Sequence, residues 1–164
     1  MPAQLRARID LLRRAGGQVE SVVDGGSMEP AIPSGAPIRI EPRQEVPAVD
    51  STVAIVTPGG LVAHRIVGRG RFPWNRHFVL TQGDGSTLCD PPVRVDLILG
   101  SVTVGRDDEW HTVPRRSSSA RATSARATLW RAVVRCALAV HPTLATALVR
   151  LSLRGRVKPV QWTA

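Results

Sequence analysis

Residues 52–67 read Thr-Val-Ala-Ile-Val-Thr-Pro-Gly-Gly-Leu-Val-Ala-His-Arg-Ile-Val. Two short runs rich in β-branched residues stand on either side of Pro58, Gly59 and Gly60, which are turn-forming residues. Runs of this length and composition predict strands, and the turn residues between them predict short connections. The segment therefore favours antiparallel pairing of neighbouring strands.

The same pattern continues on both sides of this segment. Further short runs of this kind occur at 19–23, 37–40, 77–81 and 97–104, with Gly, Pro and Asp in the gaps. The 14 Gly and 13 Pro imply many tight turns, and 43% hydrophobic content in 164 residues can build a single packed core. We therefore expect a mainly β fold, a compact antiparallel sheet or barrel rather than β-α-β units.

The two ends of the chain differ from this β-rich centre. Leu5, Ile9 and Leu12 recur at helical spacing before Gly16 and Gly17, which predicts a short N-terminal helix within residues 1–17. The β domain is expected at 18–114. A Ser-, Thr- and Arg-rich segment at 115–128 is typical of a linker, and residues 129–164 are expected to form a basic amphipathic helical tail.

Charge separates the tail from the rest of the chain. The net charge is +9, yet residues 1–114 hold 12 Lys and Arg against 13 Asp and Glu, whereas residues 115–164 hold 10 basic residues and no acid. Two accounts of the tail stay open: its apolar stripe packs on the β domain or on a partner protein, or residues 129–158 contact an anionic membrane surface. Nucleic-acid binding is not expected, because the tail has no recognisable docking motif.

Cysteine usage and hydropathy suggest a cytoplasmic location, with or without peripheral membrane contact. Cys89 and Cys136 lack the paired spacing of metal sites or disulfide frameworks, so we expect two free thiols, no metal and no cofactor. No apolar segment of the N-terminus precedes an Ala-x-Ala-like site, so no secretory signal peptide is expected. No stretch reaches the roughly 20 apolar residues that span a bilayer.

Three segments carry side chains suited to nucleophilic catalysis. Gly25 and Gly26 allow the backbone to bend sharply before Ser27, and a serine nucleophile needs a base within hydrogen-bond reach. His64 lies among aliphatic residues in a predicted strand, a setting that suits a partly buried neutral imidazole. Asp84 and Asp90 follow the predicted strand at 77–81, and either could orient the imidazole. Each segment alone also fits an ordinary turn or core residue.

Together the three segments resemble the type I signal peptidases, in the branch that uses histidine rather than lysine, over roughly residues 19–104. The resemblance rests on three boxes in the same order as in that family, which also belongs to a superfamily with the self-cleaving repressors. The boxes are Ser27, Met28, Pro30, Ile32 and Gly35; His64-Arg65-Ile66-Val67; and Gly83-Asp84 followed by Asp90.

The resemblance implies a serine endopeptidase that cleaves an extended leader or precursor peptide at small residues. Ser27 would attack the scissile carbonyl and offer its amide to the oxyanion, and His64 would transfer the proton. Asp90 is the favoured orienting acid, and Asp84 is the second candidate, although it could instead hold the glycine turn. The substrate would contact the remaining apolar residues of the serine box, Met28, Pro30 and Ile32.

The sequence departs from that family in two places. Gly25 stands where relatives commonly carry a hydroxyl residue that assists the oxyanion hole, and the loss of one such donor typically lowers turnover by about 10² to 10³. The family's N-terminal membrane anchor is also missing, which argues against general secretory processing. A catalytically weak or inactive peptide-binding module on the same fold is therefore the alternative, because a cleft can bind an extended peptide by β-augmentation without cleaving it.

Overall fold

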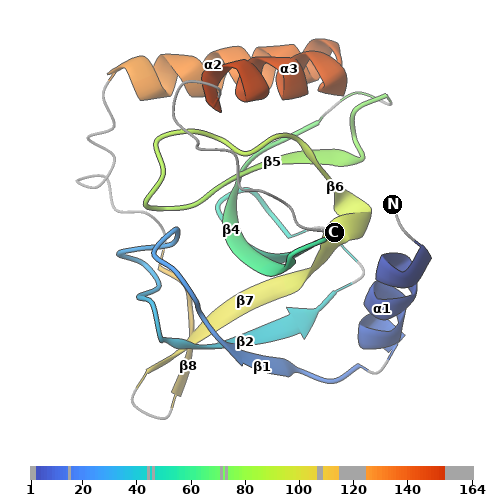
Figure 1. The fold of residues 1–164 in the computed structure, drawn as a ribbon, viewed down its shortest axis with the longest axis vertical. Coiled ribbons are helices and arrows are strands. Elements are labelled where there is room, and N and C mark those ends of the chain that lie inside the picture. The colour runs from blue at the N-terminus through green and yellow to red at the C-terminus, as the bar shows by residue number, and fades with distance from the viewer. Residues whose placement is uncertain are drawn as a thin grey trace.

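The computed structural model describes residues 3–14, 16–43, 45, 47–70, 72, 74–106, 109–114 and 125–153. Eight strands form one antiparallel sheet, a short helix precedes the sheet, and two helices follow it (Figure 1). The mainly β fold expected from the sequence is confirmed. In chain order the elements are α1 (Ala3–Arg14), β1 (Val19–Val22), β2 (Pro37–Pro42), β3 (Thr52–Thr57), β4 (Gly60–Arg69), β5 (Phe78–Gln82), β6 (Val93–Arg94), η1 (Val95–Leu97), β7 (Ile98–Arg106), β8 (Glu109–Thr112), α2 (Ala125–Val140) and α3 (Pro142–Leu153).

The strands are arranged in the order β1-β2-β7-β3-β4-β5-β6, with β8 paired to β7. The hairpin of β3 and β4 is the one quoted from residues 52–67, and its register places Val53 opposite His64. β5 pairs with β4 only from Arg65 onward, so within the described residues the Gly60–His64 half of β4 has no strand on that side. β1 likewise pairs with β2 alone.

The core is divided by the central strand β3, which is buried along most of its length. Successive side chains of a strand point to opposite faces, and here both faces are covered. Val53 and Ile55 pack in a cluster with Ile66, whereas Ala54 and Val56 pack in a second cluster with Met28 and other residues. The sheet therefore curves around two apolar layers, and the segment that carries Ser27 belongs to one of them.

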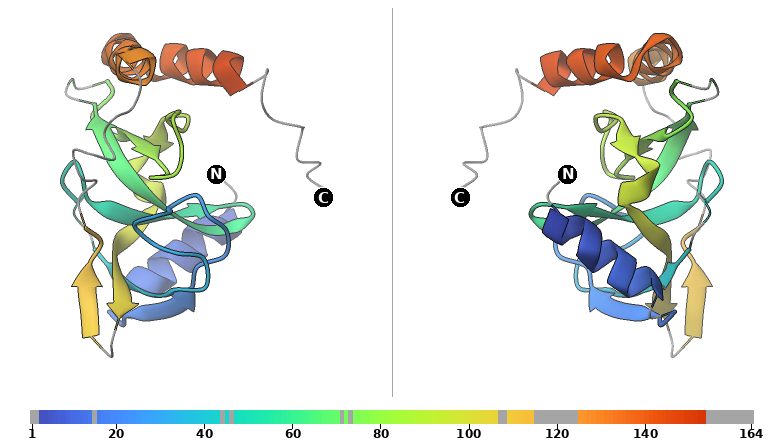
Figure 2. Two further views of the ribbon diagram at one scale, coloured as in Figure 1. Left: turned by 90° about the vertical axis from the view of Figure 1, so that its left-hand side faces the viewer. Right: turned by 90° about the vertical axis from the view of Figure 1, so that its right-hand side faces the viewer.

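The two C-terminal helices form a hairpin packed against the sheet (Figures 1 and 2). Val134, Leu138 and Val149 from the helices bury themselves against Leu80 of β5. The hairpin begins at Ala125, so the sequence-based boundary of the linker at residue 128 is wrong. Residues 115–124 of the expected linker lie outside the described residues.

The loop between β4 and β5 caps the carboxyl end of α2. Asn75 is fully buried, and its Nδ2 donates to the carbonyl oxygens of Leu138 at 2.7 Å and Ala139 at 3.3 Å. Trp74 Nε1 also donates to the Ala139 carbonyl, at 3.3 Å. These carbonyls have no partner within their own helix, so the loop satisfies groups that would otherwise lose hydrogen bonds on burial. Of the two expectations for the tail, packing on the β domain therefore applies to one face of the hairpin.

None of the helices in the described part of the chain combines the length and apolar character needed to cross a membrane.

Candidate active site

Ser27 lies in the loop between β1 and β2, at the point where the chain turns back toward the sheet. Gly25 has φ of +91°, a left-handed conformation that side chains disfavour, and it begins the bend that exposes Ser27. The next residue, Met28, is 1% exposed and packs in the core, which fixes the loop beneath the serine. The serine hydroxyl is therefore accessible while its backbone is held.

His64 faces Ser27 from β4. Its Nε2 lies 3.3 Å from Ser27 Oγ, and its Nδ1 lies 2.6 Å from Asp90 Oδ2. The His64 side chain is 14% exposed and the Asp90 side chain 31% exposed, so water reaches the site only in part. A carboxylate only accepts hydrogen bonds, so the proton of the neutral ring belongs on Nδ1 and the lone pair on Nε2 points at the serine.

Thr81 holds the carboxylate that orients His64. Its hydroxyl donates to Asp90 Oδ2 at 2.8 Å, and its carbonyl accepts from the Asp90 amide at 2.8 Å. Thr81 is fully buried in β5, so this position is set by the sheet. Sequence reasoning missed Thr81; its place at the end of the 77–81 run, nine residues before Asp90, was the only signal in the sequence.

Asp84 takes part in a different set of interactions from Asp90. It accepts two hydrogen bonds from Arg65, Nε to Oδ1 at 2.8 Å and Nη2 to Oδ2 at 2.6 Å, and both side chains are 3% exposed. Arg65 also donates to the carbonyl oxygens of Asp50 and Pro114. Through Arg65 of β4, Asp84 is thus linked to the segments of Asp50 and Pro114. The structure does not bring Asp84 to His64. Its assignment as a catalytic acid is corrected, because its carboxylate is occupied by Arg65.

Gly83 and Gly85 let the Asp84 turn approach the serine loop closely. The amide of Gly85 donates to the Ser27 carbonyl at 3.0 Å. A Cβ on Gly83 would lie 2.3 Å from that same carbonyl oxygen and 3.2 Å from His64 Nε2. No side chain fits there without displacing the backbone of Ser27. The glycine box therefore contributes to the site through close packing of backbones.

The amide of Ser27 is available to an oxyanion. Within the part of the chain that the structure describes, this N–H donates to no protein atom. A Cβ on Gly25 would meet nothing within 4 Å, so space exists where relatives of the resembled family place a hydroxyl, but the positive φ disfavours any such residue. The site therefore offers the Ser27 amide without help from residue 25.

A groove of about 210 Å³ runs beside the serine. It is bordered by Ser21 and Val22 of β1 on one side and by Leu61, Val62 and Ala63 of β4 on the other, and Met28, Ile38, Ile40 and Ala54 contribute to its lining. Of the expected substrate contacts, Met28 lines this groove. Ile32 is fully buried in the core and Pro30 is exposed outside the groove, so neither is placed to contact a substrate there.

Comparison of the chain with protein-family models, curated proteins and solved structures found no match.

Proposed function

We propose that the protein is a serine endopeptidase of the signal-peptidase type, acting on an extended leader or precursor peptide. The observation that carries the proposal is the continuous chain of contacts from Ser27 Oγ through His64 to Asp90 and Thr81. A serine is activated when an adjacent base takes its proton and a third group orients that base. The same geometry supports the motif resemblance drawn from the sequence.

The reaction would proceed in two halves. Ser27 Oγ attacks the scissile carbonyl carbon while its proton passes to His64 Nε2, and the oxyanion that forms accepts a hydrogen bond from the Ser27 amide. The carbon–nitrogen bond then breaks, and the proton on His64 moves to the leaving amine. Water next gives a proton to His64 and attacks the acyl-serine ester; the ester C–O bond then breaks, His64 passes the proton to Ser27 Oγ, and the carboxylic acid is released.

The groove supports an extended substrate. Both strands that border it, β1 and the Gly60–His64 half of β4, lack a second strand partner in the described residues. An extended peptide laid between them would find unpaired backbone groups, which is how strand addition binds peptides. A groove of about 210 Å³ lined mostly by aliphatic residues suits small apolar side chains.

We also propose that the protein works in the cytoplasm, at an anionic membrane surface. Cys89 and Cys136 are both free, in keeping with a reducing compartment. Three apolar residues of α2 are exposed: Leu129 (66%), Val133 (40%) and Val140 (67%). They lie four and seven residues apart, so they share the outer side of the helix.

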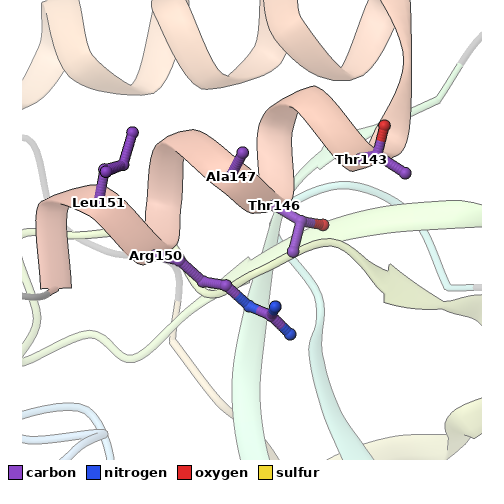
Figure 3. Close-up of a pocket in the computed structure, with 5 residues that line it drawn as sticks. All are labelled: Thr143, Thr146, Ala147, Arg150 and Leu151. Carbon is purple, nitrogen blue, oxygen red and sulfur yellow. The ribbon is translucent and has the colours of Figure 1, made fainter.

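The second helix of the hairpin continues this outer surface. Leu144 and Leu151 of α3 are 47% and 61% exposed and lie two turns apart on the same side of their helix. In Figure 3, Leu151 and Ala147 point toward the upper edge of α3 and Arg150 toward its lower edge, and all three line one depression of about 450 Å³. An exposed apolar surface in a segment with ten basic residues and no acid matches an anionic lipid interface.

The alternative function is a peptide-binding module that does not cleave. Gly25 is the observation that favours it, because the Ser27 amide would have to stabilise the oxyanion without the hydroxyl that relatives of the resembled family provide.

A fluorophosphonate probe discriminates between the two. The endopeptidase is expected to be phosphonylated at Ser27, as read by mass spectrometry of its peptides, and the His64→Ala variant is expected to lose the label. Ser34→Ala removes an exposed serine of the same loop and serves as the matched control, with labelling unchanged. Binding of extended peptides without any labelling of Ser27 would favour the module.

A further inference from the structure

Asp24 is the only charged residue among those that line the groove in the described part of the chain. It is exposed, lies three residues before Ser27, and its carboxylate has no hydrogen-bond or ion-pair partner among the described residues. The other lining residues are aliphatic or carry small hydroxyls. Among the described residues, one carboxylate without a partner therefore lines the space in which a peptide would lie.

Glu29 places a second carboxylate next to the nucleophile. Its carboxyl carbon and oxygens lie 3.2–3.4 Å from the position a Cβ on Gly26 would take, so the side chain folds back over the residue that precedes Ser27. Glu29 is exposed and, like Asp24, has no ion-pair partner in the described residues. In the chain, Ser27 therefore lies between two carboxylates that have no ion-pair partner among the described residues.

Two arginines of the sheet, one on β4 and one on β2, are each paired with a carboxylate. Arg65 is paired with Asp84, and Arg39 of β2 is paired with Glu20 at 2.8 Å while its guanidinium stacks 4.0 Å above the Trp110 ring. Asp24 and Glu29, the charged residues that the described part of the chain places in the serine loop, are thus both acidic in a protein whose net charge is +9. A groove that carries charge of the opposite sign to the rest of the molecule attracts ligands of the complementary charge.

We propose that Asp24 and Glu29 are specificity residues that select peptides carrying a lysine or arginine within a few residues of the bond to be cleaved. This inference rests on the proposed function, and it names the charge of the substrate class. Exposed charge pairs each contribute a factor of about 1.4 to 5 in an equilibrium or rate constant, so the two together favour a cationic over a neutral side chain by up to roughly 25-fold. Neither residue takes part in proton transfer.

Competition between peptides tests the proposal. One extended peptide with small residues at the bond is made in versions that carry lysine, glutamine or glutamate at each of the four positions before and after it. The relative kcat/KM of each version is read by mass spectrometry for the wild type, Asp24→Asn, Glu29→Gln and the double variant. Glu45→Gln removes an exposed carboxylate away from the groove and is the matched control.

The wild type is expected to prefer lysine over glutamine by about threefold or more at one or two positions, less so at 0.5 M than at 0.05 M salt. Asp24→Asn and Glu29→Gln should each lower that preference by a factor of about 1.4 to 5, and Glu45→Gln should leave it unchanged. An equal preference in the wild type and in the double variant would overturn the proposal.

Binding to the Ser27→Ala variant separates this inference from the proposed function. The same peptides, labelled with a fluorophore, are titrated with Ser27→Ala and with Ser27→Ala combined with Asp24→Asn, and the Kd is read by anisotropy. A lysine preference that Asp24→Asn weakens would support the inference even if the wild type cleaves none of the peptides. Cleavage without a charge preference would leave the proposed function standing and overturn the inference, and absence of both binding and cleavage would overturn the two together.

Discussion

Asp84 and Asp90 carry the same carboxylate six residues apart, and their surroundings assign them different tasks. Asp90 accepts from His64 at 2.6 Å and from Thr81 at 2.8 Å. Asp84 is buried in an ion pair with Arg65, which also donates to the carbonyl oxygens of Asp50 and Pro114. Asp90 therefore belongs to the candidate site, and Asp84 stabilises the fold.

The two aspartates should separate activity from stability. Asp90→Asn is expected to lower turnover by on the order of 10⁴-fold, because the amide no longer holds the Nδ1–H tautomer, with little change in the free energy of unfolding. Asp84→Asn leaves the Arg65 charge buried without its partner and is expected to lower that free energy by about 3–5 kcal/mol. Urea unfolding and peptide turnover measure the two effects; the reverse pattern would exchange the two assignments.

The two cysteines should differ in reactivity. Burial raises the pKa of the Cys89 thiol to about 11, because desolvation disfavours the thiolate; nearby Asp90 also raises it, while Arg131 and Arg135 lower it. Cys136 is exposed on α2. At pH 8 a thiol reagent is expected to modify one cysteine in the native protein, Cys136, and two in urea. Rapid native labelling of Cys89 would show that α2 does not cover it.

The raised pKa of Cys89 also makes the free energy of unfolding depend on pH. The folded state holds this proton more tightly than the unfolded state, so the contribution is complete below the ordinary thiol pKa of 9.0 and is lost as pH rises toward about 11. It therefore does not make stability depend on pH near neutrality.

At the residue scale, the sequence was sufficient to name Ser27 and His64, because both occur in boxes with distinctive neighbours. It left the acid open, because both aspartates follow the same strand and both occur in turn-forming sequences. Only the three-dimensional position of the Arg65 guanidinium shows that Asp84 is occupied. Ile32 was expected at the substrate and lies in the core, because an apolar residue five positions after a serine can face either side of a loop.

At the element scale, the long strands agree with the sequence-based expectation, and β3 begins and ends with the first run of the quoted segment, at Thr52 and Thr57. β6 and β8 were missed. β6 contains two residues after Pro91 and Pro92, and β8 reads Glu-Trp-His-Thr, so neither has the alternation that identifies a strand. Both are recruited by pairing with neighbouring strands, which a local pattern does not reveal.

The helical hairpin divides its apolar residues between two faces, and this division can be tested within α2. Leu138 is 1% exposed against the sheet, whereas Leu129 of the same helix is 66% exposed. Leu138→Ala is expected to lower the free energy of unfolding by about 2–5 kcal/mol through the cavity it leaves, and Leu129→Ala by less than about 0.5 kcal/mol. Similar small effects of both, measured by urea unfolding, would mean that the hairpin does not dock on the sheet.

At the scale of the whole molecule, the charges are distributed in three regions. Residues 1–114 are nearly neutral, the serine loop carries the acidic Asp24 and Glu29, and the C-terminal fifty residues are positive throughout. The hairpin anchors its buried face to β5 and leaves Leu129, Val133 and Val140 outside.

Contact with anionic membrane should depend on salt and on the outer face. The full chain is expected to sediment with phosphatidylserine vesicles at 0.05 M salt and to be released at 0.5 M, because the attraction of basic residues is screened. Val133→Glu and Leu144→Glu are expected to weaken sedimentation while leaving the melting temperature nearly unchanged, since both side chains are exposed. Neutral phosphatidylcholine vesicles provide the control, and equal binding to both lipids would contradict the account.

The central claim is that Ser27, His64 and Asp90 form a hydrolytic centre, and cleavage of a defined peptide library tests it most directly. Wild type, Ser27→Ala and His64→Ala are incubated with the same library, and new termini are identified by mass spectrometry. Triad members act as a unit, so the account predicts discrete cleavages by the wild type that are lost in both variants, while all three proteins unfold at similar urea concentrations. Cleavage that persists in Ser27→Ala, or a folded wild type that cleaves nothing, would contradict it.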